Sequence, residues 1–170
     1  MQEKKNHPVI VAMLWICFLA AISLVAYLSF QNGEDAKEVG KSAIQLIAQQ
    51  NSSGNGVSQQ DIDTLTYIIR QAGRTGAFFV IGILGTLAVY VSFKKWNWFL
   101  KGGITAAVLI GFAYLTEKLK IFIPSRHYNY DEMMLSIIAV IAGFALVTVI
   151  TLIFCAMKRI SRLLAAALNP

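Results

Sequence analysis

The stretch MMLSIIAVIAGFALVTVITLIFCAM at residues 133–157 decides the fold class of this chain. It holds no charged side chain, and a helix of about 20 apolar residues crosses a hydrocarbon core ~30 Å thick. Toward the N-terminus, uncharged apolar stretches recur at residues 102–116, 75–93 and 9–30. The pattern predicts an all-α membrane protein with four transmembrane helices.

The third stretch, residues 102–116, is shorter than a membrane span. It becomes long enough only if Glu117, Lys118 and Lys120 enter the membrane or its interface. Ionisable side chains are costly inside a membrane, and they commonly carry function there. We therefore expect function at the C-terminal end of the third helix.

The composition excludes an ordinary soluble domain. Of 170 residues, 56% are hydrophobic and 14% charged, and the mean hydropathy is +0.60. The net charge of +6 comes from basic residues that mostly flank the apolar stretches, so membrane topology explains it without a nucleic-acid partner. The first apolar run exceeds the roughly 7–15 residues of a cleavable signal-peptide core, so we predict a retained first helix.

Small residues and cysteines give predictions about packing and chemistry. Gly103, Ala107 and Gly111 recur at four-residue spacing, as do Ala139 and Gly143, a pattern that lets membrane helices approach closely. Cys17 and Cys155 lie inside apolar stretches without metal-ligand spacing, so we interpret them as small packing residues. We expect no metal and no cofactor.

The charges of the connecting segments predict the orientation. The N-terminal segment, residues 94–101 and the segment after residue 157 contain eight basic residues and one acidic residue. The other two connections contain seven basic and eight acidic residues. Because short basic segments stay in the cytoplasm, both termini are predicted to be cytoplasmic, with the first and third connections outside.

We predict a single domain over residues 1–170. Its segments are a first helix at 8–30, an extracytoplasmic helical connection at 31–74, a second helix at 75–93, a third at 101–123, a fourth at 133–157 and an amphipathic cytoplasmic tail at 158–170. Within the connection, Ile62, Leu65 and Ile69 mark one apolar helix face. No proline separates this helix from the second span, so the two are expected to be continuous.

Charged side chains gather at the predicted outer end of the helices. Arg70 and Arg74 are four residues apart and share a helix face. Asp131 and Glu132 open the fourth helix, where the N-terminus favours anions. Guanidinium groups bind phosphate and carboxylate bidentately, so this end is predicted to bind such a group.

Glu117 and Lys120 complete this set, three residues apart at the end of the third helix. At ~1.5 Å per residue, Glu117 lies ~22 Å along the helix from Gly102, near the hydrocarbon boundary. An unpaired carboxylate there costs a few kcal/mol, so a basic partner is expected, with Arg74 and Arg126 as candidates. A second interpretation treats such residues as interfacial anchors and helix caps; it fits Lys118 and Asp131 well, and also Lys120.

Three motifs occur in order within residues 25–145. They are Ser29-x-Gln31 at the end of the first helix, Arg70-Gln71-Ala72-Gly73-Arg74 followed by the apolar residues 81–84, and Glu117-x-x-Lys120-x-Phe122-Ile123-Pro124-Ser125-Arg126 with an acid six residues on. This order resembles the VanZ-like family of bacterial membrane proteins. The corresponding family patterns are Ser-x-Gln, Arg-Lys-x-x-His and Glu-x-His-Gln-x-Phe-x-Pro-Gly-Arg…Asp.

The chain departs from the family pattern at several positions. It has Arg74 for histidine, Ala77 for glutamate, Ser125 for glycine, Glu132 for aspartate and Ser136 for asparagine. The resemblance carries over to Gln31, Arg70, Glu117, Arg126 and Glu132. With the residues predicted above, the expected ligand-binding set is Gln31, Arg70, Arg74, Glu117, Lys120, Arg126, Asp131 and Glu132.

The resemblance implies a bacterial plasma-membrane protein that lowers sensitivity to glycopeptide antibiotics such as teicoplanin. We expect a non-catalytic protein whose outward-facing charged pocket binds a lipid headgroup, a cell-wall precursor or a lipoglycopeptide. The alternative is an intramembrane enzyme that acts on a lipid-linked envelope substrate with Glu117 as general acid or base, although Arg74 is a poor proton shuttle. A transporter or channel fits less well, since the four spans show no evident inverted repeat. The sequence leaves the oligomeric state open.

Overall fold

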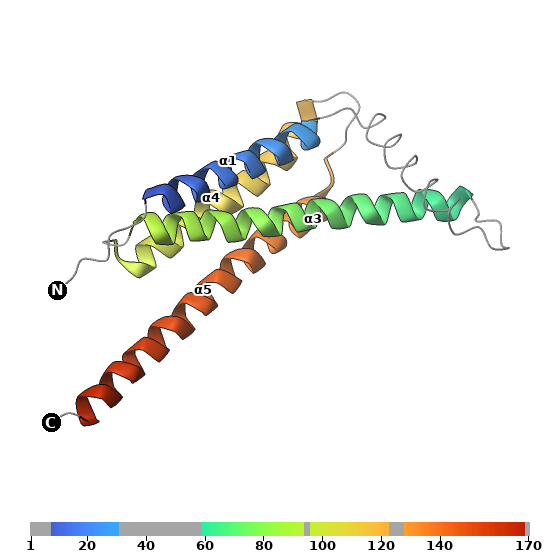
Figure 1. The fold of residues 1–170 in the computed structure, drawn as a ribbon. Helices are drawn as coiled ribbons and strands as arrows, with labels where there is room; N and C mark the ends of the chain where they lie inside the picture. The colour runs from blue at the N-terminus through green and yellow to red at the C-terminus, as the bar shows by residue number, and fades with distance from the viewer. Residues whose placement is uncertain (1–7, 31–58, 94–95, 123–127, 169–170) are drawn as a thin grey trace.

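The computed structural model describes residues 8–30, 59–93, 96–122 and 128–168. This part of the chain forms four long helices and one short 3-10 helix (Figure 1). They are α1 Pro8–Phe30, α3 Gln59–Ser92, α4 Trp98–Lys118, η1 Leu119–Phe122 and α5 Tyr130–Leu168. Each long helix contains a stretch long and apolar enough to cross a membrane. The prediction of an all-α chain with four such helices is confirmed, while Gln31, Arg126 and residues 31–58 lie outside the described residues.

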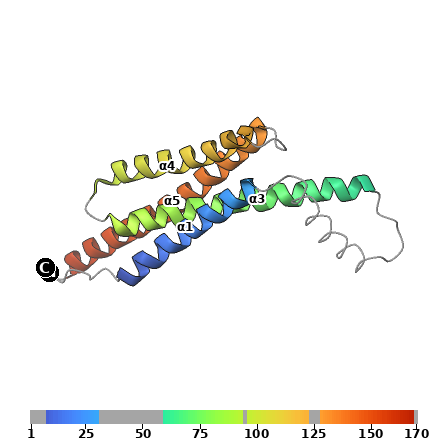
Figure 2. The same ribbon diagram turned by 90° about the horizontal axis from the view of Figure 1, so that it is seen from above.

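The four helices form a bundle around α3, which packs against α1, α4 and α5. Successive helices run in opposite directions, so α1 begins at the end of the bundle where α5 ends (Figures 1 and 2). The C-terminal half of α5 leans away from the other helices (Figure 1). The opposite end, where α4 finishes and α5 starts, is called the charged end below because it holds the ion cluster.

Helix α3 is a single helix of 34 residues, ~51 Å long at 1.5 Å per residue. It includes residues 59–74 of the predicted connection, so the expected continuity of that helix with the second span is confirmed. The absence of proline explains why the helix continues into the apolar stretch. As a result, α3 extends past the other helices at the charged end and carries Arg70 and Arg74 on a regular helix (Figure 1).

Helix α5 is also continuous, over 39 residues. Residues 158–168 were predicted to form a separate amphipathic tail, but they extend α5 without a break. No glycine or proline lies between Phe144 and Leu168, and alanine and leucine, which are strong helix formers, dominate the last turns. Helix α4 in turn begins after Asn97, whose side chain accepts a hydrogen bond from the Phe99 amide and caps the helix.

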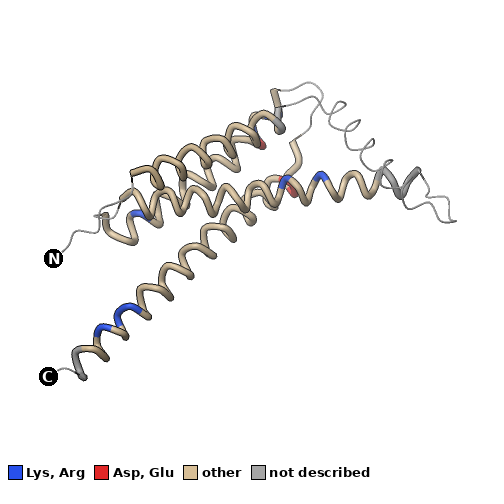
Figure 3. Tube along the Cα trace, viewed as in Figure 1, with Lys and Arg blue, Asp and Glu red and all other residues tan. Residues whose placement is uncertain are grey.

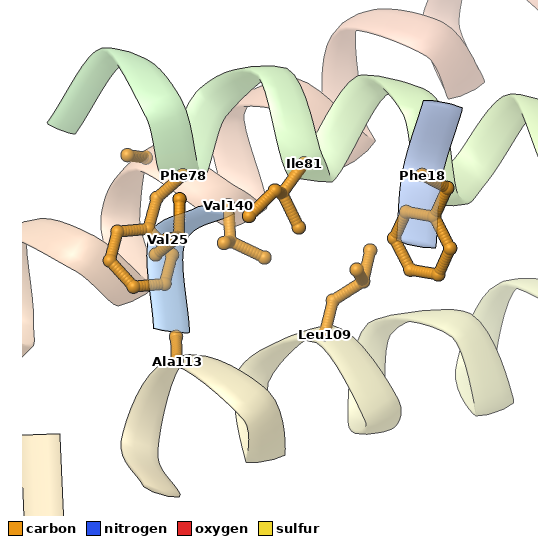
Figure 4. Packing of buried hydrophobic residues seen from close by; sticks show 8 residues of the cluster. Phe18, Val25, Phe78, Ile81, Leu109, Ala113 and Val140 are labelled. Carbon is orange, nitrogen blue, oxygen red and sulfur yellow. The ribbon is translucent and has the colours of Figure 1, made fainter. Parts of the chain in front are cut away.

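The core of the bundle is apolar and draws two residues from each long helix (Figure 4). The set is Phe18 and Val25 of α1, Phe78 and Ile81 of α3, Leu109 and Ala113 of α4, and Ala139 and Val140 of α5. At one edge, Trp15 Nε1 donates a hydrogen bond of 2.9 Å to Ser92 Oγ and ties α1 to α3. These contacts hold the helices in the register that assembles the charged end.

Glycines bring α3 and α5 into direct backbone contact. A Cβ atom on Gly82 would lie 2.5 Å from the Val140 carbonyl oxygen, and one on Gly143 would overlap the Phe79 carbonyl oxygen. The predicted close-packing residues Gly103 and Gly111 instead face open space, and Ala107 is exposed. Four-residue spacing identifies a helix face but does not show which neighbour that face meets, so the prediction was wrong for these three residues of α4. It is confirmed for Ala139 and Gly143 of α5, since Ala139 lies in the core and Gly143 meets the α3 backbone.

The two cysteines also differ from the prediction. Cys17 and Cys155 are both exposed on the outside of the bundle rather than packed within it. In an apolar span every face of a helix is hydrophobic, so the sequence does not distinguish core positions from those on the outer surface. Neither cysteine contributes to the packing of the described helices.

Candidate functional site: a buried ion cluster at the charged end

Four ionisable side chains meet at the charged end of the bundle, and we call them the ion cluster. They are Arg74 of α3, Glu117 in the last turn of α4, Lys120 of η1 and Glu132 in the first turn of α5. Figure 3 shows acidic and basic residues coming together where α3 passes the start of α5. The middle of the helices separates them from the basic residues near the end of α5 (Figure 3).

Arg74 connects α3 to both neighbouring helices. Its Nη2 donates to Glu117 Oε1, and its Nη1 donates to Glu132 Oε2. The same Nη2 lies 2.9 Å from the backbone oxygen of Glu132 and 3.0 Å from Ser136 Oγ. The guanidinium is therefore fixed by one carboxylate from α4 and by three oxygen atoms from α5.

Lys120 supplies the second cation of the ion cluster. Its Nζ donates to both carboxylate oxygens of Glu117, at 2.9 and 3.0 Å, and lies 3.5 Å from Glu132 Oε2. Two basic and two acidic side chains alternate in this arrangement, and their formal charges cancel. A neutral set of this kind offsets the cost of placing each charge near the hydrocarbon.

The members of the ion cluster differ in exposure. The Glu117 side chain is fully covered and that of Lys120 is 2% exposed, whereas Arg74 and Glu132 are 16% and 17% exposed. Ser136, which accepts from Arg74, is also buried. The cluster thus has a closed side at Glu117 and Lys120, and a side open to its surroundings at Arg74 and Glu132.

The local structure explains how these side chains reach one another. Glu117 and Lys120 are three residues apart where α4 tightens into the 3-10 helix η1, which places both on one side. Asn129 caps the start of α5, because its Oδ1 accepts from the Asp131 amide at 2.9 Å. Capping fixes the first turn of α5, so Glu132 points to Arg74 while Asp131 is exposed.

The structure brings together four of the eight predicted site residues and separates two others. Arg70 is exposed one turn away from Arg74, with its Cζ 6.0 Å from the centre of the Tyr67 ring, and it lies outside the ion cluster. Asp131 is exposed beside the cluster. Gln31 and Arg126 lie outside the described residues.

The roles of Lys120 and Ser136 in the structure differ from those that the sequence indicated. The anchor interpretation of Lys120 fails, because its side chain is buried against Glu117 rather than extended to the interface. Ser136 was noted only as a departure from the resembled family, yet it binds Arg74. Three of those departures, Arg74, Glu132 and Ser136, are in mutual contact, so they are coupled in space.

A second cationic group lies beside the ion cluster on the exposed side of α4. Lys118 Nζ lies 5.8 Å from the centre of the Tyr114 ring and 5.3 Å from that of Tyr128. Tyr128 in turn donates its hydroxyl to Met133 Sδ at 3.2 Å. Lys118 thus fits the anchor interpretation, as an exposed cation stacked on aromatic rings.

The donor set bears on the chemistry available to the site. Within the described residues, no three histidine, cysteine, aspartate or glutamate side chains are grouped so that they could hold a metal ion. Guanidinium and ammonium groups that face carboxylates are suited to holding or exchanging anionic partners.

Comparison with protein-family models, with curated proteins and with solved structures finds no match.

Proposed function

We propose that the chain is a VanZ-like multi-pass protein of the bacterial plasma membrane that binds an anionic group of an envelope component at its charged end. The ligand is a lipid headgroup, a cell-wall precursor or a lipoglycopeptide, and its binding lowers sensitivity to glycopeptide antibiotics. In this proposal both termini are cytoplasmic and the charged end faces outward. The distribution of basic residues among the connecting segments supports that orientation.

The observation that carries the proposal is that the ion cluster is buried at Glu117 and Lys120 but partly exposed at Arg74 and Glu132. Ionisable side chains at membrane depth are a functional feature by default, because pairs of apolar residues would fill the same space at lower cost. Arg74 and Glu132 are partly accessible, and the exposed Arg70 lies one turn beyond Arg74 on the same helix face. Two guanidinium groups one turn apart fit a phosphate or carboxylate group.

The alternative, an intramembrane enzyme that uses Glu117, is less well supported. The Glu117 carboxylate has no exposed surface, and both of its oxygens already accept hydrogen bonds from Lys120. A general acid or base must reach the proton that it transfers. Turnover of a labelled lipid-linked precursor by the purified protein, lost in Glu117→Gln, would favour the enzyme.

The proposal is tested by charge reversal at Arg70 in a host made less sensitive to teicoplanin by this chain. Arg70→Glu should restore sensitivity, because it places a carboxylate where the anionic group is expected to bind. Lys118→Glu is the matched control, since Lys118 is an exposed cation at the same end that lies on α4 against two tyrosine rings, not on the helix face of Arg74. Equal resistance of the Arg70→Glu and wild-type strains, at equal protein levels, would refute the proposal.

The proposed orientation has a separate test. In a chain with Cys17 and Cys155 replaced by serine, single cysteines are introduced at the exposed positions Asp131 and Ser161. A membrane-impermeant maleimide added to intact spheroplasts should label Asp131→Cys. It should label Ser161→Cys only after permeabilisation, and the reverse pattern would invert the topology.

A further inference from the structure

The two carboxylates bound to Arg74 are held very differently. Glu117 is fully covered and, within the part of the chain that the structure describes, accepts three hydrogen bonds, two from Lys120 and one from Arg74. Among the described residues, the Glu132 carboxylate accepts one hydrogen bond, from Arg74 Nη1; it has Lys120 Nζ at 3.5 Å and is 17% exposed. Of the two acids, Glu132 is therefore the one that an incoming anion reaches first and displaces more easily.

The Arg74 guanidinium is also held by contacts other than that with the Glu132 carboxylate. Nη2 is held by Glu117 Oε1, by the backbone oxygen of Glu132 at 2.9 Å and by Ser136 Oγ at 3.0 Å. Ser136 Oγ is itself fixed by donating to the same backbone oxygen at 2.9 Å. If the carboxylate swings away, Nη1 remains in place and keeps both of its N–H groups available for another oxygen atom.

We infer that a phosphate group binds this site by displacing the Glu132 carboxylate from Arg74 Nη1, with Arg70 as its second contact. The inference rests on the proposed function and specifies its ligand class and its mode of binding. Glu132 acts as an internal competitor, because its carboxylate pairs with Arg74 in the absence of ligand. The ligand must therefore bind Arg74 more favourably than this carboxylate does. Lys120, 3.5 Å from Glu132 Oε2, receives the displaced carboxylate, so the charge of Glu132 stays compensated.

A phosphate group fits this exchange better than a carboxylate group. Arg70 and Arg74 are one helical turn apart, a rise of about 6 Å, so they share a helix face. A tetrahedral phosphate presents oxygen atoms in more directions than the two oxygens of a planar carboxylate, so it contacts both guanidinium groups at once more readily. The cation supplied by Arg70 also offsets the additional negative charge of a phosphate monoester.

The test uses the purified full-length protein in dodecyl maltoside, titrated calorimetrically with two probes. Dioctanoyl phosphatidic acid presents the phosphate on a lipid, and inorganic phosphate presents it alone. Glu132→Gln should bind phosphatidic acid about tenfold more tightly than wild type, because the competitor is removed, which corresponds to ~1.4 kcal/mol. Asp131→Asn is the matched control, because it removes an adjacent exposed charge that does not pair with Arg74, and it should change the dissociation constant by about twofold or less.

Arg70 is tested in the same assay. Arg70→Gln should weaken the binding of phosphatidic acid about tenfold, while Lys118→Gln should leave it within about twofold of wild type. A second variant, Glu132→Asp, keeps the charge but shortens the side chain, so it should also bind more tightly than wild type. It provides the measurement if Glu132→Gln does not fold.

Each outcome bears on the inference or on the proposed function. Tighter binding by both Glu132 variants, but not by Asp131→Asn, supports the displacement. If the protein binds phosphatidic acid but does not bind inorganic phosphate, the phosphate group is that of a lipid. If wild type binds with an affinity that neither Glu132 variant improves, the displacement is overturned while the proposed binding function stands. If neither wild type nor Glu132→Gln binds either probe, phosphate recognition at this site is overturned as well.

Discussion

Gly82 of α3 packs directly against Gly143 of α5, and neither position has room for a Cβ atom. A Cβ atom on Gly143 would meet the backbone of Phe79 and would lie 3.0 Å from the Ile83 amide nitrogen. Backbone atoms cannot rotate away as a flexible side chain can, so a larger residue must separate the helices. The same crossing sets the distance across which Arg74 reaches Ser136 and Glu132.

Gly143→Ala should therefore lower the free energy of unfolding by about 1–3 kcal/mol, the usual cost of overpacking. Gly111→Ala is the control, because its Cβ would meet nothing within 4 Å. Since alanine is a better helix former than glycine, the control should be neutral or slightly stabilising. Titration of the micelle-bound protein with sodium dodecyl sulfate measures both, and equal stabilities would contradict the close crossing.

Glu117→Gln should destabilise the protein by about 3–5 kcal/mol, because it leaves Arg74 and Lys120 without their shared buried carboxylate. The double variant Glu117→Gln with Lys120→Met removes one charge of each sign and should recover part of that loss. The coupling energy from this double-mutant cycle measures the interaction itself. A double variant no more stable than Glu117→Gln alone would mean that the two side chains are not coupled as the geometry indicates.

Arg74→Lys keeps the charge but removes the planar fork that reaches two helices. An ammonium group on a single flexible stem cannot replace the simultaneous contacts of Nη1 and Nη2 with Glu132 and Glu117. We expect a loss of about 1.5–3 kcal/mol in the same titration, typical of a hydrogen bond to a charged group. Arg70→Lys, outside the ion cluster, should change stability by no more than about 0.5 kcal/mol. Similar values for the two variants would contradict the bridging role of Arg74.

Trp15→Phe should cost about 0.5–1.5 kcal/mol through the loss of the hydrogen bond to Ser92 Oγ. Phenylalanine retains an aromatic ring next to Phe18, whose ring centre lies 5.8 Å from that of Trp15. The control is Trp15→Phe in a Ser92→Ala background, where the hydrogen bond is already absent. If the tryptophan substitution costs as much in that background, the hydrogen bond does not join α1 to α3.

Much of this architecture could be predicted from local features of the sequence. Three uncharged stretches of membrane length, and a fourth that reaches this length only with its charged end, predict four helices, because a helix satisfies all of its backbone hydrogen bonds within the hydrocarbon core. The cost of an unpaired carboxylate near the hydrocarbon predicted a basic partner for Glu117, and Arg74 takes that place. Both predictions depend on the energy of one segment or one residue, without reference to tertiary structure.

The residues that were not predicted depend on how the helices are rotated against one another. Gly103 and Gly111 have the same spacing pattern as a packing face, yet their helix turns that face away from its neighbours. Ser136 is one small polar residue in a long apolar span, and its role depends on the distance between α3 and α5. Lys120 is buried because η1 tightens the end of α4, which the sequence pattern does not specify.

None of the described side chains of α1 belongs to the ion cluster, which α3, η1, α4 and α5 assemble together. Within the described residues, α1 joins the bundle through apolar contacts such as Phe18 and Val25 and through the Trp15 hydrogen bond. A helix of similar volume and hydrophobicity that keeps the Trp15 donor would make the contacts of this described part of α1. Sequence drift should therefore be fast in α1 and slow around Arg74, so related chains would share the charged residues long after their first helices had ceased to look alike.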